Sequence, residues 1–174
     1  MEDKKVLTRK QILNAAFECF ARYGYLKTNF LDVAERAGIS RSLLYTYFKN
    51  KKDLFMTMTA GNNDSYKRQS DIILASDLLS TKEKLRKILD IWIIDPYRII
   101  NRSPFPNTWL DQLKSVKQSE MEFRALFISS IAPLLGKDVA EIVVLSFRGL
   151  LDDRPSIEVL EQRTEILINV LVKS

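Results

Sequence analysis

The chain has 174 residues, with 27 lysines and arginines, 22 aspartates and glutamates, one cysteine and no histidine. The lack of histidine excludes Ser-His-Asp and Cys-His catalytic pairs and two-histidine zinc sites, and a single cysteine excludes an intramolecular disulfide. No apolar run approaches the roughly 18 residues that cross a membrane, and the N-terminus lacks the apolar segment of a signal peptide. We therefore expect a soluble, cytoplasmic protein without a metal site or a cofactor.

The net charge of +5 is concentrated in the first third of the chain. Residues 1–60 carry 11 basic and 6 acidic side chains, whereas residues 61–174 carry 16 of each sign. Such an asymmetry fits a nucleic-acid-binding module joined to a neutral one, and it fits a chance excess of charge on a solvated face equally well.

Helix signals follow one another along the first half of the chain. The expected helices cover about residues 9–23, 30–37, 41–48 and a longer stretch from residue 51 that passes through Gly61. A capping box at Thr8–Gln11 opens the first of them, and Gly24 closes it. Asn29 and Ser40 are good N-caps for the second and third helices.

The helical pattern continues beyond residue 60. A capping box at Ser80–Glu83 opens a helix in which Pro96 predicts a kink or break. A loop is expected at 101–107. Further helices are expected over residues 108–117, 119–135, 137–151 and 156–172. No stretch alternates with period two, so the sequence predicts an all-α chain.

Residues 30–49 have the spacing of a helix-turn-helix. Gly38 supplies the positive φ of the turn, Ala34 is small where two helices cross, and Ile39 fills the wedge between them. The inner apolar positions are Val33, Ala37, Leu44 and Tyr47. The second helix of such a pair can enter the major groove of DNA, although a plain helical hairpin has the same spacing.

The segment from residue 28 to residue 54, TNFLDVAERAGISRSLLYTYFKNKKDL, resembles the signature T-T-x-x-x-I-A-x-x-A-G-V-S-x-G-x-L-Y-x-H-F-x-N-K-x-x-L of the TetR transcriptional regulators. The resemblance covers about residues 8–58. The chain departs from the pattern at Asn29, Ser42 and Tyr47, which stand in place of Thr, Gly and His.

The resemblance implies DNA-contacting roles at the start of two helices. Thr28 and Asn29 would cap the second helix and meet a phosphate. The recognition helix would open with Ser40, Arg41, Ser42 and Leu43. Among them Arg41 is best suited to read guanine through two hydrogen bonds.

The resemblance also assigns four later positions. Tyr45 would pack against bases or backbone, and Tyr47 would stand at a phosphate-contacting position. Lys51 would bind a phosphate at the start of the fourth helix, with Lys49 as a weaker candidate. The alternatives are a solvated face for the basic residues and core packing for the two tyrosines.

The last expected helix is apolar on two faces, which calls for two partners. One stripe, taken as the dimer interface, is Ile157, Leu160, Thr164, Leu167 and Leu171, and a second is Val159, Ile166 and Val170. The resemblance implies a homodimer that packs its last two helices as a four-helix bundle and binds a near-palindromic operator. A monomeric bundle that buries both stripes is the alternative.

Aromatic residues of the middle segment could line a pocket for an apolar or aromatic effector, or could be ordinary core. They are Trp92, Tyr97, Phe105, Trp109, Phe123 and Phe127.

The leading hypothesis is a sequence-specific DNA-binding regulator, a repressor released by a small molecule. Its DNA-binding domain would be residues 1–50, with the motif at about 29–48, and its regulatory and dimerisation domain residues 51–174. A second hypothesis gives the C-terminal domain a protein partner in place of a small ligand. An enzyme is not expected, because no cluster of acid, base or nucleophile is present.

Overall fold

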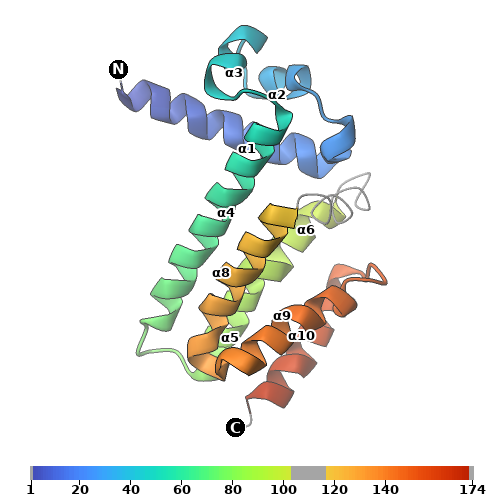
Figure 1. Cartoon of the computed structure of the whole chain (residues 1–174). Coiled ribbons are helices and arrows are strands. Elements are labelled where there is room, and N and C mark those ends of the chain that lie inside the picture. Colours follow the sequence, from blue (N-terminus) through green and yellow to red (C-terminus); the bar gives the residue numbers. More distant parts are fainter. Residues whose placement is uncertain (1, 103–116, 173–174) are drawn as a thin grey trace. The chain divides into compact units, whose positions relative to one another are not determined.

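The structure is a computed structural model, and it describes residues 2–102 and 117–172. Every regular element in these ranges is a helix, so the all-α prediction is confirmed (Figure 1). Most of the loop expected at 101–107 and of the helix expected at 108–117 lies outside the described residues. Within them, no helix is long and apolar enough to cross a bilayer.

The chain divides into two compact units. Among the described residues, the first contains 2–62, 102 and 117–120, and the second contains 63–101 and 121–172. Helix α4 (Lys51–Leu74) contributes to both. The division into domains at residue 50 stays a prediction.

The first unit begins with α1 (Glu2–Lys27), which changes direction at Gly24 (φ 78°, ψ 162°). The prediction that this helix starts at residue 9 was wrong. The acidic N-terminus and the helix-forming residues after it allow the helix to start at Glu2. Gln11 therefore closes no capping box; its side-chain amide donates to the carbonyl oxygen of Ala37 at 2.9 Å.

Helix α2 (Phe30–Arg36) starts with the predicted cap. The side chain of Asn29 accepts from the backbone N–H groups of Leu31 and Asp32, and Asp32 accepts from the N–H of Asn29, which completes a capping box. Two donors that the first helical turn leaves unpaired are thus satisfied.

The turn between α2 and α3 (Arg41–Tyr47) is held by Gly38, whose φ is 65°. Its N–H donates to Glu35, and the N–H of Ile39 donates to Ala34, the two bonds of a Schellman motif. Ser40 then caps α3 by accepting from the N–H of Leu43 at 3.1 Å. The positive φ at Gly38 and the cap at Ser40 are as predicted.

The second unit continues α4 and adds α5 (Thr81–Leu89), a π-helical turn η1 (Asp90–Ile94) and α6 (Asp95–Asn101). Ser80 and Glu83 form the predicted capping box. The break expected at Pro96 takes the form of the π turn, in which the N–H of Asp95 donates to Asp90, five residues back.

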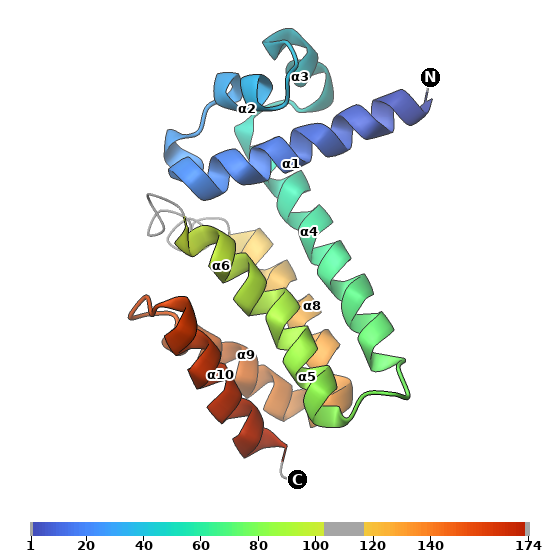
Figure 2. The ribbon, with the colours of Figure 1, turned by 180° about the vertical axis from the view of Figure 1, so that it is seen from behind.

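Three further helices complete this unit: α8 (Lys117–Leu135), α9 (Lys137–Leu150) and α10 (Ile157–Leu171). Gly136 (φ 81°) separates α8 from α9, and the chain turns again at residues 151–156 before α10. Helix α10 packs against α5, η1 and α6, and Figures 1 and 2 show this unit from opposite sides.

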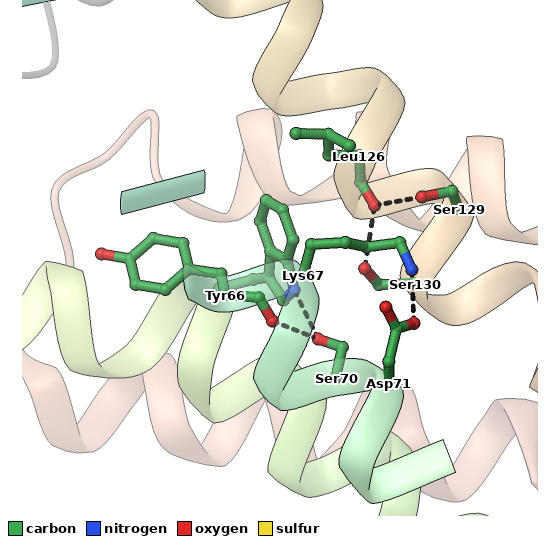
Figure 3. A network of polar contacts seen from close by, with 8 residues as sticks. Tyr66, Lys67, Ser70, Asp71, Leu126, Ser129 and Ser130 are labelled. Atoms are coloured by element: carbon green, nitrogen blue, oxygen red, sulfur yellow. Dashed lines mark hydrogen bonds and ion pairs between the residues drawn. The ribbon is translucent and has the colours of Figure 1, made fainter. Parts of the chain in front are cut away.

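The core of the second unit is aromatic. The indole of Trp92 stacks on Phe127 with ring centroids 5.2 Å apart, and Phe123 and Tyr66 meet it edge-on. The Trp92 N–H donates to the Ser70 hydroxyl at 2.9 Å, and that hydroxyl donates to the Tyr66 carbonyl within α4 (Figure 3). The indole N–H and the Ser70 hydroxyl of this core are therefore paired.

Candidate nucleic-acid interface

Helix α3 presents a polar outer face. Its only buried residue is Leu44, which packs inward. The exposed side chains of the helix are Arg41, Ser42, Leu43, Tyr45 and Thr46. Val33, Ala37 and Leu44 lie in the core as predicted, and Tyr47 is half-buried, between the two roles considered for it.

Three side chains are layered on this face. The guanidinium of Arg41 lies 5.6 Å from the ring centroid of Tyr45, and its Nη2 donates to the tyrosine hydroxyl at 3.4 Å. The ring of Tyr45 in turn contacts Phe30, the first residue of α2, at 4.7 Å between centroids. Phe30 is buried, so the layer fixes Arg41 relative to the core and reduces the rotamer freedom it would lose on binding.

The residues at the start of α2 differ in accessibility. Asn29 is exposed, and its amide oxygen is engaged in capping. Thr28 is only 1% exposed, and its hydroxyl hydrogen-bonds the carbonyl oxygens of Gly24 and Cys19. Thr28 therefore ties the end of α1 to α2, and a buried hydroxyl with internal partners has no free surface for a phosphate.

Lys51 and Lys49 also differ in the accessibility of their ammonium groups. The Lys51 ammonium donates to the carbonyl oxygens of Leu26 (3.2 Å) and Thr28 (3.0 Å) and lies 4.6 Å from the ring centroid of Tyr25. Burial lowers the pKa of Lys51, and the charge of Asp32 acts against that shift. Lys49 is exposed, and its side chain can reach a phosphate.

Thr46 is a candidate DNA-contacting residue that the sequence did not predict. This residue is exposed one turn after Ser42, and its hydroxyl donates to the carbonyl oxygen of Leu43 at 2.7 Å. The i, i+4 spacing from Ser42 places Thr46 on the same face of α3, and this spacing is the signal that could have predicted it as a contact residue.

A hollow of about 490 Å³ lies between α1 and α2 in the first unit. It is lined by charges of both signs, among them the ion pair of Arg36 with Glu18. Cys19 lines it as well; its thiol lies 3.6 Å from the Asp32 carbonyl oxygen. Burial, helped by the negative charge of Asp32, raises the pKa of this thiol to about 11, so it is neutral at physiological pH.

Of the six aromatic residues considered for an effector pocket, Phe105 and Trp109 lie outside the described residues. Trp92, Phe123 and Phe127 pack on one another in the second unit. Tyr97 is separate from them, and its hydroxyl donates to the carbonyl oxygen of Pro155 at 2.7 Å.

The two apolar stripes of α10 have different environments. In the first stripe Leu160 and Thr164 are covered within the chain, at 0% and 4% exposure, and Ile157, Leu167 and Leu171 are half-buried. In the second stripe Val159, Ile166 and Val170 are exposed. Assigning Leu160 and Thr164 to a dimer interface was therefore wrong, because their surface is already buried against their own unit. Helix α9 adds Val139, Ile142 and Leu145 to the exposed apolar residues.

Comparison with known sequences gives matches to part of the chain. Residues 12–58 match the family model of bacterial regulatory proteins of the tetR family. The HTH-type transcriptional regulator TtgR of Pseudomonas putida is 29% identical over 82 residues, 47% of this chain and 39% of that protein. An HTH-type transcriptional repressor of Mycobacterium tuberculosis is 37% identical over 57 residues, 33% of this chain and 30% of its own length. The chain thus spans about two fifths of TtgR and less of the repressor, and both are named as regulators rather than enzymes.

Solved structures match nearly the whole chain. A TetR transcriptional regulator from Legionella pneumophila has a TM-score of 0.75 at 19% identity, over 94% of this chain and 96% of that one. A transcriptional regulator from Aquifex aeolicus VF5 has a TM-score of 0.66 at 17% identity, over 95% and 99% of the two chains. At such identities the likeness establishes the fold: a helix-turn-helix followed by a helical C-terminal part.

Proposed function

We propose that the chain is a repressor-type transcriptional regulator of the TetR family, whose model matches residues 12–58. In the proposal, α3 enters the major groove of a specific operator, and the protein acts in the cytoplasm, where bacterial DNA is found. The observation that carries it is the layer of Arg41 on Tyr45 and Phe30, which presents a fixed guanidinium on the exposed face of α3.

Arg41 is the proposed base-reading residue, because a guanidinium can donate two hydrogen bonds to O6 and N7 of guanine. Ser42, Leu43, Tyr45 and Thr46 are exposed beside it and complete the proposed contact face. The proposed contacts to backbone phosphates come from Lys49 and from the exposed cap residues Asn29 and Ser40. The Lys51 ammonium contributes any N–H that does not donate to its two carbonyl partners.

The proposed assembly is a homodimer, so that two copies of α3 meet successive turns of a near-palindromic site. Support comes from the exposed apolar side chains of α9 and α10, since single chains rarely leave such a surface uncovered. The interface in this revised form centres on Ile142, Leu145, Val159, Ile166 and Val170.

Release by a small apolar or aromatic effector is proposed for the second unit, whose helices surround the Trp92 cluster. A regulator whose exposed α9 and α10 surface binds a different protein is the second candidate. Sedimentation of the pure chain distinguishes the proposed homodimer from this second candidate. A homodimer self-associates through the α9 and α10 surface, whereas a docking surface for another protein leaves the pure chain monomeric.

The proposed DNA recognition is tested with Arg41→Ala on two duplexes, one selected by the wild type from a random pool and one of random sequence. The expected result is a loss of affinity of roughly tenfold or more for the selected duplex and a smaller loss for the random one. Arg68→Ala, which removes an equally exposed charge from α4, is the control. Equal losses on both duplexes would overturn the base-reading role.

A further inference from the structure

The N-terminal part of α1 carries a basic surface that precedes the family match. Residues 5–17 contain Lys5, Arg9 and Lys10 and no acidic residue. The helix begins at Glu2, so roughly ten residues, or about 15 Å of helix, come before residue 12. These turns of α1 project beyond the α2–α3 pair in both views of the ribbon (Figures 1 and 2).

Glu2 and Asp3 precede this stretch, and three further acidic residues of the first unit lie in a different place. Glu18, Asp32 and Glu35 line the hollow between the later part of α1 and α2. The stretch from residue 5 to residue 17 is thus basic, whereas acidic residues stand on both sides of it in α1.

Arg9 links this basic surface to the recognition helix. Its guanidinium lies over the ring of Phe48, 5.6 Å from the centroid, and Phe48 is the C-cap residue of α3. Stacking uses the flat face of a guanidinium and leaves the N–H groups at its edge free for hydrogen bonds. Arg9 is therefore held beside the C-terminal end of α3 with its donors available.

Lys5 extends the same surface by one helical turn, because residues four apart share a face of a helix. Both side chains are exposed. Among the ion pairs of the described residues neither takes part, whereas Arg36 is paired with Glu18.

A recognition helix contacts bases with its N-terminal residues, so its C-terminal end points toward the phosphates that border the major groove. We propose that Lys5 and Arg9 bind backbone phosphates on the flank of the operator, beside the site that α3 reads. These contacts add affinity without sequence preference and extend the footprint of each bound chain. The inference rests on the proposed DNA-binding function.

The test measures dissociation constants over a range of salt concentrations for Lys5→Gln/Arg9→Gln, with the selected duplex and a random duplex of equal length as probes. Gln keeps the helix propensity. Removing one phosphate-binding side chain lowers the slope of log K against log salt by roughly 0.9, so the expected decrease is about two for each bound chain. Affinity falls by the same factor on both duplexes, and the ratio between them stays at its wild-type value.

Two further double variants act as controls. Arg68→Gln/Lys137→Gln removes two exposed charges from the second unit and is expected to keep the wild-type slope. Lys5→Arg/Arg9→Lys retains both charges and is expected to restore it. A slope for Lys5→Gln/Arg9→Gln equal to that of the wild type overturns this inference alone. A wild-type chain that binds neither duplex overturns the proposed function as well.

Discussion

Arg41 and Tyr45 lie one turn apart on α3, and the guanidinium of the first covers the ring of the second at 5.6 Å. The hydrogen bond between them is long, at 3.4 Å, so stacking is the main contact. Tyr45 thus acts as a support that sets the direction of Arg41.

This relationship predicts different effects for two substitutions of Tyr45. Tyr45→Phe keeps the ring and should change the ratio of specific to random DNA affinity by less than about threefold. Tyr45→Ala removes the stack and the contact with Phe30, and should lower that ratio about fivefold, in keeping with about 1 kcal/mol for an exposed cation–π contact. Fluorescence anisotropy with both duplexes measures the ratio. An equal decrease of this ratio in the two variants would mean that the hydroxyl itself contacts DNA.

Lys51 is predicted to stabilise the first unit. Lys51→Met removes two charge-assisted hydrogen bonds to Leu26 and Thr28, and should lower the free energy of unfolding by about 1 kcal/mol, since the ammonium is partly in water. The expected decrease in Tm is about 2–4 °C. The neighbouring exposed Lys52→Met is the matched control, and equal melting of the two variants would contradict the structural role.

Cys19 is predicted to make stability depend on alkaline pH. Its pKa is raised from 9.0 to about 11 by burial, so the folded chain favours the neutral thiol. The resulting stabilisation is complete below pH 9 and is lost as the pH rises from about 9 to about 11. Urea unfolding at pH 8 and pH 10 should therefore show the advantage of the wild type over Cys19→Ala shrinking by on the order of 1 kcal/mol. A constant difference between the two proteins would refute the shift.

The exposed surface of α9 and α10 is predicted to hold the dimer together. Ile142 is 64% exposed in the single chain, and Ile142→Glu places a charge on that surface. Burial of an unpaired carboxylate is costly, so the variant should sediment as a monomer at concentrations where the wild type is dimeric. Ile72 on α4 is 72% exposed, and Ile72→Glu should leave the dimer intact. The proposed interface fails if both variants behave alike.

Local signals predicted the helix-turn-helix well, because each depends on neighbouring residues. Gly38 requires a positive φ, and Asn29 and Ser40 cap helices with side chains that reach only two or three residues. The same kind of signal misled at Thr8, where a capping pattern occurs inside a helix that had already begun at Glu2.

Such local signals could not predict tertiary contacts. Lys51 meets Leu26 and Thr28 more than 20 residues away, so its internal role could not be read from its position in a motif. Both stripes of α10 are largely apolar in sequence. Only the packing of the second unit reveals that Leu160 and Thr164 face inward, whereas the second stripe remains exposed.

Selection of bound duplexes from a random pool by the purified chain measures whether α3 reads a specific DNA sequence. The expected result is enrichment of a near-palindromic site with guanine at the position that Arg41 reads, and loss of that guanine preference in a parallel selection with Arg41→Ala. A wild-type pool that stays random through repeated rounds would mean that α3 does not recognise a DNA sequence.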